Sequence, residues 1–162
     1  MRIGVLSDTH LPMRARSLPA ILFEAFEGVE AILHAGDLAC EEVLIELGAL
    51  APVYAVRGNV DPPELWSRLP LDRVLTFAGL KVGLTHGHGT SGSTPERALR
   101  RFAADTVACV VFGHSHDPLC ERRGDVLLFN PGSPTDRRRQ PQHSYGILTI
   151  ENGRIDGEII RF

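Results

Sequence analysis

Eight histidine, aspartate and asparagine side chains of this 162-residue sequence have the chemistry of metal ligands, and all of them follow short apolar runs. Apolar runs of this length are typical of buried strands. Because the carboxyl ends of parallel strands share one edge of a sheet, residues that follow such strands meet in one crevice, where open α/β sheets place their ligands. The eight residues are Asp8, His10, Asp37, Asn59, His86, His88, His114 and His116.

The donor set consists of imidazole, carboxylate and amide groups and contains no cysteine. Such a set suits borderline to hard divalent ions better than a structural thiolate zinc site does. Without His88 there are seven donors, which are too many for one tetrahedral ion. They suit two ions that share a bridging carboxylate and lie roughly 3.5 to 4 Å apart, as in two-metal phosphoryl-transfer sites. We therefore expect two divalent metal ions, with Mn²⁺ first and Ni, Fe, Co or Zn as alternatives.

The first third of the chain must supply the strands that position the early residues of this set. Apolar runs at residues 3–6, 31–33 and 53–56 each end in a polar or glycine-containing turn and predict strands. Segments 18–27 and 41–50 between them have helical character. A βαβαβ order implies parallel strands joined by crossover helices.

The rest of the chain is richer in strands. Residues 74–77 and 81–85 flank a short glycine-containing connection and predict a hairpin, and a helix follows with Thr94 as its N-cap and Pro95 at the first helical position. Segment 134–143, which contains Arg137, Arg138 and Arg139, reads as a solvated loop. Further strands are expected at 107–112, 118–122, 126–129, 145–150 and 155–162. No linker interrupts the chain, so residues 1–162 are expected to form a single domain.

The order of five short motifs identifies a resemblance to a known family. The motifs are Asp-x-His at 8–10, Gly-Asp at 36–37, Gly-Asn at 58–59, His-Gly-His at 86–88 and Gly-His-x-His at 113–116. In this order they resemble the calcineurin-like metallophosphoesterases. The short length, residues 56–61 and 85–88, and the Asn-Pro-Gly-Ser sequence at 130–133 are similar to the small YfcE-type phosphodiesterases among them.

This resemblance implies a four-layer α/β/β/α sandwich of two mixed sheets with helices on the outer faces, which the two halves of the chain also suggest. It implies a dinuclear metal-dependent phosphodiesterase that acts on a small phosphodiester, and Asn59 would also contact this substrate. A hydroxide shared by the two metals would attack the phosphodiester in line. The resemblance assigns Asp8, His10 and His116 to one metal, Asn59, His86 and His114 to the other, and Asp37 to both.

The sequence departs from the larger members of the family at Val60, where many of them carry a histidine thought to protonate the leaving oxygen. Val60 can provide no proton, so leaving-group help would come from water, a metal or His88. Without a positioned general acid, substrates with acidic leaving groups are favoured. We therefore expect phosphodiesters to be preferred over alkyl phosphomonoesters.

The sequence also admits functions other than phosphodiester hydrolysis. A non-catalytic interaction scaffold on the same fold is the main alternative, because a retromer subunit that resembles this family acts as a scaffold. A dinucleotide-binding site is not expected, because the Gly-x-Gly-x-x-Gly match at 87–92 lacks the acidic residue that such a site needs after the next strand. A serine hydrolase is not expected either, because Asp117 occupies the position of the second glycine of a nucleophile elbow.

Composition restricts the partners and the compartment. With 17 basic and 20 acidic residues, the net charge of -3 disfavours a general nucleic-acid partner. Three cysteines without a CxxC pair indicate a reduced, cytoplasmic setting, and no apolar stretch approaches the roughly 20 residues of a membrane helix. A homo-oligomer is compatible with the sequence.

Overall fold

Three apolar runs in the first third of the chain form parallel strands in the computed structural model, which describes all 162 residues. The strands are β1 (Arg2–Leu6), β2 (Ala31–His34) and β3 (Val53–Ala55). Every residue of β2 is buried, as expected for a strand that is covered on both faces. The hairpin of β9 (Ser144–Glu151) and β10 (Arg154–Arg161) pairs with β1 and completes a sheet of order β10-β9-β1-β2-β3.

The second sheet also has five strands, in the order β4-β5-β6-β8-β7. Strands β5, β6 and β8 are parallel, whereas β4 and β7 pair antiparallel at the two edges. The strands are β4 (Asp72–Phe77), β5 (Leu80–Thr85), β6 (Cys109–Val111), β7 (Leu119–Arg123) and β8 (Val126–Asn130).

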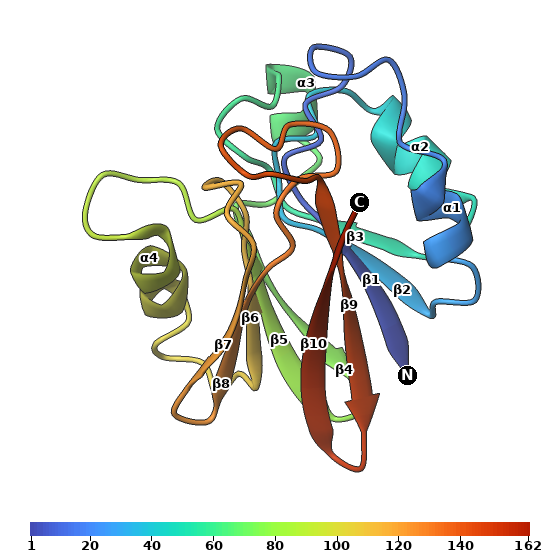
Figure 1. Cartoon of the computed structure of the whole chain (residues 1–162). Helices are drawn as coiled ribbons and strands as arrows, with labels where there is room; N and C mark the ends of the chain where they lie inside the picture. Colours follow the sequence, from blue (N-terminus) through green and yellow to red (C-terminus); the bar gives the residue numbers. More distant parts are fainter.

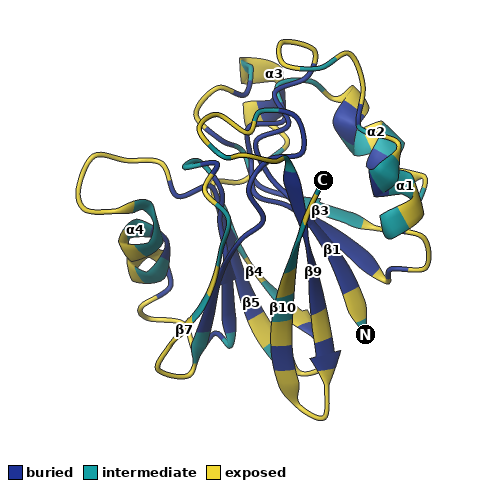
Figure 2. Ribbon diagram, viewed as in Figure 1, coloured by how far each residue is buried: buried dark blue, intermediate teal, exposed yellow.

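The sheets pack face to face, and helices cover their outer faces (Figure 1). Helices α1 (Ile21–Ala25) and α2 (Glu42–Gly48) lie on the first sheet, and α4 (Thr94–Arg101) lies on the second. A cluster of 16 buried residues fills the space between the sheets, with further clusters of 14 and 6 residues beneath the helices. Figure 2 shows the strands as the mainly buried part of the molecule. The predicted four-layer sandwich is thus confirmed.

Three helical details differ from the expectations. The first helix has only five residues, because Pro19 precedes it and the chain turns at Gly28 with a positive φ of 72°. Ser93 rather than Thr94 is the N-cap of α4, since Ser93 and Glu96 form a reciprocal capping box. The four-residue helix α3 (Pro63–Trp66) was not expected. The longest helix has eight residues, so no helix could cross a bilayer.

Candidate metal centre

The candidate ligands lie in the loops at the carboxyl ends of β1, β2, β3, β5 and β6, where the loops gather at the top of Figure 1. Five of these residues have a left-handed backbone, which is uncommon for residues other than glycine. Their φ values are 55° at Asp8, 46° at His10, 58° at Asp37, 67° at His114 and 57° at His116. Such conformations cost on the order of 1 to 3 kcal/mol each and cluster at functional sites. The loops are therefore shaped to present these side chains.

One group of ligand atoms consists of Asp8, His10 and His116. Asp8 Oδ1 lies 3.3 Å from His116 Nε2 and 3.8 Å from His10 Nε2, and the two imidazole nitrogens are 3.3 Å apart. Asp8 is completely buried, and its Oδ1 has no hydrogen-bond partner. A buried carboxylate oxygen without a partner is costly unless a cation satisfies it. This oxygen therefore fits a metal ion.

A second group contains Asp37, Asn59, His86 and His114. Asp37 Oδ2 lies 3.2 Å from His86 Nε2. The amide oxygen of Asn59 lies 3.1 Å both from His86 Nε2 and from His114 Nδ1. Two imidazole nitrogens and two oxygens thus converge here, which is a donor set that divalent transition ions accept.

Both carboxylates lie between the two groups. Asp37 Oδ2 is 3.8 Å from His10 Nε2 and 3.2 Å from His86 Nε2, so it reaches one nitrogen of each group. Asp8 also belongs to two triads of mutually close ligand atoms, one with His10 and His116 and one with Asp37 and His86. The structure thus brings all seven predicted ligands together, and a bridging role for Asp37 is compatible with its position.

Hydrogen bonds on the far side of two imidazole rings fix which nitrogen faces the centre. His86 Nδ1 donates to the carbonyl oxygen of Ala35 at 2.8 Å, and His116 Nδ1 donates to the carbonyl oxygen of Asp136. These bonds hold the Nε2 atoms toward the carboxylates. Such contacts are the usual way in which proteins orient histidine ligands.

The charges of the site favour added positive charge. Burial alone would raise the pKa of Asp37, but the hydrogen bond and charge of His86 and the Val60 N–H lower it to about 2. The pKa of Asp8 is lowered as well, because contacts with His116 and His86 outweigh burial. The same contacts raise the pKa values of His86 and His116 against the effect of burial. Burial lowers the pKa values of the other two histidine ligands, His10 and, to about 4, His114, so these rings are neutral near pH 7. With two ionised carboxylates among them, the centre suits cations.

His88 and Val60 border the centre. His88 is exposed, and its ring centroid is 5.6 Å from that of His86. The side chain of Val60 is 42% exposed, and its N–H donates to Asp37 Oδ1 at 2.9 Å.

The expectation that segment 134–143 is simply solvated is wrong for its first residues. Pro134 and Thr135 are buried, and Thr135 Oγ1 donates to the carbonyl oxygen of Thr9, between two candidate ligands. The following residues Arg137, Arg138 and Arg139 are exposed as expected.

Sequence reasoning expects the turn at residues 130–133 to contact the site, but it assigns no role to two side chains that hold the ligand loops. Ser133 Oγ donates to the carbonyl oxygen of Asp8 at 2.8 Å. Asp61 is only 2% exposed and accepts backbone N–H bonds from Asp37, Ala39 and Gly58. The position of Asp61 two residues after the Gly-Asn motif was the available signal, since a short carboxylate there can bond to nearby backbone N–H groups.

Comparison with known proteins agrees with this geometry. The family model described as the calcineurin-like phosphoesterase superfamily domain matches residues 1–153. A probable metallophosphoesterase of Methanothermobacter thermautotrophicus is 42% identical over 163 residues, covering 99% of this chain and 92% of the relative. A phosphodiesterase of Methanocaldococcus jannaschii is 32% identical over 148 residues, covering 82% of this chain and 83% of the relative.

A solved structure has the same fold. Vps29 of Entamoeba histolytica, in a complex with Zn²⁺, superimposes with a TM-score of 0.80 at 24% identity and covers 99% of both chains. At this identity the likeness concerns the fold alone.

Proposed function

This chain belongs to the calcineurin-like phosphoesterase superfamily and is a metal-dependent phosphoesterase, and we propose that it hydrolyses small phosphodiesters with two divalent ions. The observation that carries the proposal is the convergence of five ligand side chains in two triads that share Asp8, whose buried Oδ1 has no hydrogen-bond partner. Asn59 and His114 complete the donor set beside His86. Mn²⁺ is the proposed ion, with Ni, Fe, Co or Zn as alternatives, because imidazole, carboxylate and amide donors suit such ions.

In this proposal Asp8, His10 and His116 hold one ion, and Asn59, His86 and His114 hold the other. Asp37 contributes to both, because its Oδ2 reaches His10 and His86. When bound, the two ions would polarise the phosphoryl oxygens and lower the pKa of a shared water, which would then attack phosphorus in line with the leaving group.

The protein side chains position these groups. The Ala35 and Asp136 carbonyl oxygens fix the rings of His86 and His116, so these ligands need no reorganisation on binding. The Oδ1 atom of Asn59 faces His86 and His114, which leaves its Nδ2 as a hydrogen-bond donor for a phosphoryl oxygen.

The substrate preference follows from the residue next to Asn59. Val60 has no proton to give, so the leaving oxygen would depart without a general acid at that position. Aryl oxygens and other acidic leaving groups tolerate this better than alkoxides do. His88 is a titratable side chain at the rim, with its ring 6.4 Å from that of His114, and it is a candidate helper.

Elemental analysis together with an assay on bis(p-nitrophenyl) phosphate tests the proposal. Protein loaded with Mn²⁺ or Zn²⁺ is expected to bind two ions per chain and to release nitrophenolate, and Asp37→Ala is expected to lose both properties. One bound ion with full activity would contradict the dinuclear arrangement. Two bound ions without turnover of any phosphodiester would instead favour a non-catalytic scaffold.

A further inference from the structure

The single tryptophan of the chain lies beside the metal centre rather than in the core. Trp66 ends helix α3, and its side chain is 47% exposed. It borders a pocket of about 280 Å³ that also reaches Asn59, a proposed ligand. The pocket is lined by Arg57, Gly58, Asn59, Trp66, Leu71 and His88. A ligand attached to a phosphate at the metal centre could therefore extend onto the indole ring.

Arg57 gives this pocket a fixed cation. Its guanidinium carbon lies 5.1 Å from the centroid of the Trp66 ring, an arrangement that holds the side chain in place. No carboxylate pairs with Arg57, and its buried Nε has no hydrogen-bond partner. Because the Nε is buried, the terminal N–H groups of Arg57 are the donors that a ligand in the pocket can use, beside the aromatic surface of Trp66.

Exposed apolar side chains are concentrated at this place. The structure has six exposed large hydrophobic side chains, and three of them are Val60, Trp66 and Leu71. Trp66 and Leu71 line the pocket, and Val60 follows Asn59 directly in the chain. Exposed apolar side chains that gather at one place mark binding sites more often than scattered ones do.

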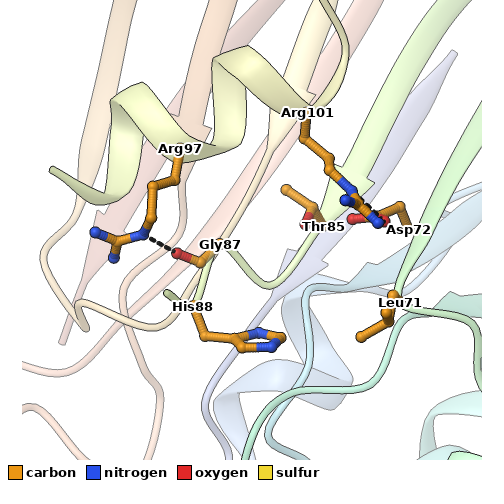
Figure 3. Close-up of a pocket in the computed structure, with 7 residues that line it drawn as sticks. All are labelled: Leu71, Asp72, Thr85, Gly87, His88, Arg97 and Arg101. Carbon is orange, nitrogen blue, oxygen red and sulfur yellow. Dashed lines mark hydrogen bonds and ion pairs between the residues drawn. The ribbon is translucent and has the colours of Figure 1, made fainter. Parts of the chain in front are cut away.

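A second pocket lies beside the pocket of Trp66, and its arginine side chains already have partners within the protein. It measures about 130 Å³ and shares Leu71 and His88 with the first pocket, while Arg97 and Arg101 reach it from α4 (Figure 3). Arg97 donates to the carbonyl oxygen of Gly87, and Arg101 pairs with Asp72. Because these cations are already paired within the protein, the free hydrogen-bonding capacity lies on the Trp66 side.

We propose that the pocket of Trp66 and Arg57 binds the nucleobase of a nucleotide-type phosphodiester whose phosphate lies at the metal centre. A base offers a flat face to stack on the side of the indole that Arg57 does not cover, and acceptor atoms for the donors of Arg57. An alkyl chain would leave Arg57 unpaired, and a bare anion would not use the faces of Trp66 and Leu71. This inference rests on the proposed function and names its class of substrate.

Intrinsic fluorescence tests the inference directly, because Trp66 is the only tryptophan. In Zn²⁺-loaded protein, adenosine 5′-monophosphate is expected to quench the emission saturably, and ribose 5-phosphate is expected to leave it unchanged. By calorimetry, Trp66→Ala should weaken adenosine monophosphate binding by about tenfold, within the range that base stacking supplies. Binding of ribose 5-phosphate should not change. Trp66→Phe should retain most of the affinity.

A kinetic comparison uses two diesters with the same leaving group, thymidine 5′-(p-nitrophenyl) phosphate and methyl p-nitrophenyl phosphate. Trp66→Ala is expected to lower the ratio of their kcat/KM values by about tenfold. Ile45→Ala is the matched control, because Ile45 is also an exposed apolar side chain, at 66%, and lines none of these pockets. It should leave the ratio unchanged.

Equal affinity of the wild type for adenosine monophosphate and ribose 5-phosphate, or an unchanged kinetic ratio in Trp66→Ala, would overturn the inference. Metal content and turnover of bis(p-nitrophenyl) phosphate, measured on the same wild-type preparation, separate this result from failure of the proposed function. If the protein binds two ions and turns over the diester, only the nucleobase assignment is wrong. If it does neither, the proposed function fails and the inference fails with it.

Discussion

Asp61 is expected to hold two metal-binding loops together, and Asp61→Asn should weaken both folding and metal binding. Its Oδ2 accepts the N–H groups of Asp37 at 3.0 Å and Gly58 at 2.7 Å, and its Oδ1 accepts that of Ala39 at 2.7 Å. Asp37 and Ala39 belong to the loop after β2, whereas Gly58 belongs to the loop after β3. One carboxylate thus links the proposed bridging ligand to the loop that carries Asn59.

The expected size of the effect follows from these three hydrogen bonds. Asparagine has one acceptor oxygen, so in its better orientation it keeps the two bonds of Oδ2 and turns its NH₂ toward the N–H of Ala39. Leaving a buried donor unpaired costs about 1 to 3 kcal/mol, with the lower part of that range expected for the partly buried N–H of Ala39, and the two remaining bonds lose the charge of the acceptor. We expect a loss of about 2 to 3 kcal/mol, or roughly 5 to 10 °C in Tm for a chain of this length. Removing a group that orients ligands typically lowers metal affinity by about 10- to 100-fold.

Urea unfolding of the metal-free protein and calorimetric titration with Zn²⁺ measure the two effects separately. Asp105→Asn is the matched control, because Asp105 is exposed and its carboxylate makes no hydrogen bond. If Asp61→Asn has the same unfolding midpoint and the same Zn²⁺ affinity as Asp105→Asn, Asp61 does not hold these loops.

Three further predictions concern the metal ligands, the leaving group and the dependence of stability on pH. Asp37→Ala is expected to remove most metal from both positions, whereas His10→Ala or His86→Ala should weaken metal binding mainly at one position. Elemental analysis measures the metal content, and two retained ions in Asp37→Ala would exclude a bridging role. Val60→His should raise monoester relative to diester hydrolysis, by up to about 10²- to 10⁴-fold for a well-placed general acid, and an unchanged ratio in a metal-loaded variant would refute this. Burial lowers the pKa of His34 to about 3. Between about pH 6.5 and 3, His34 is therefore protonated in the unfolded chain and neutral in the folded protein. Stability of the metal-free protein should therefore fall between pH 6.5 and 3, by about 1.4 kcal/mol per pH unit from this residue, and His34→Gln should show a flatter curve in urea unfolding at several pH values. Parallel curves would show that His34 does not contribute.

The strands and the meeting of the ligands could be predicted because both depend on local patterns. An apolar run of four or five residues is enough to indicate a buried strand, and the parallel order of β1, β2 and β3 follows from the helical segments between them. Once these strands are parallel, Asp8, Asp37 and Asn59 must lie at one edge. The motifs then add the histidines that follow β5 and β6.

The parts that were not predicted depend on contacts between distant residues or on very short elements. Ser133 bonds to the carbonyl oxygen of Asp8 across 125 positions, and no local pattern reports such a contact. Helix α3 has four residues, fewer than a periodic pattern needs to show. At α4, Ser93 and Thr94 can both cap a helix, and only the hydrogen bonds of Glu96 decide between them.

The left-handed backbone of five proposed ligands also bears on how the protein could evolve. Glycine adopts such conformations freely, so at His114, for example, glycine would relieve backbone strain of about 1 kcal/mol or more. A lineage that no longer used the centre would thus gain stability by replacing these residues with glycine. Its descendants would then keep the fold and lose metal binding. Because aspartates and histidines occupy them in this chain, the positions are better explained by selection for binding than by selection for stability. In a scan of single substitutions, residues at which stability rises while metal binding falls would mark the centre without any knowledge of the reaction.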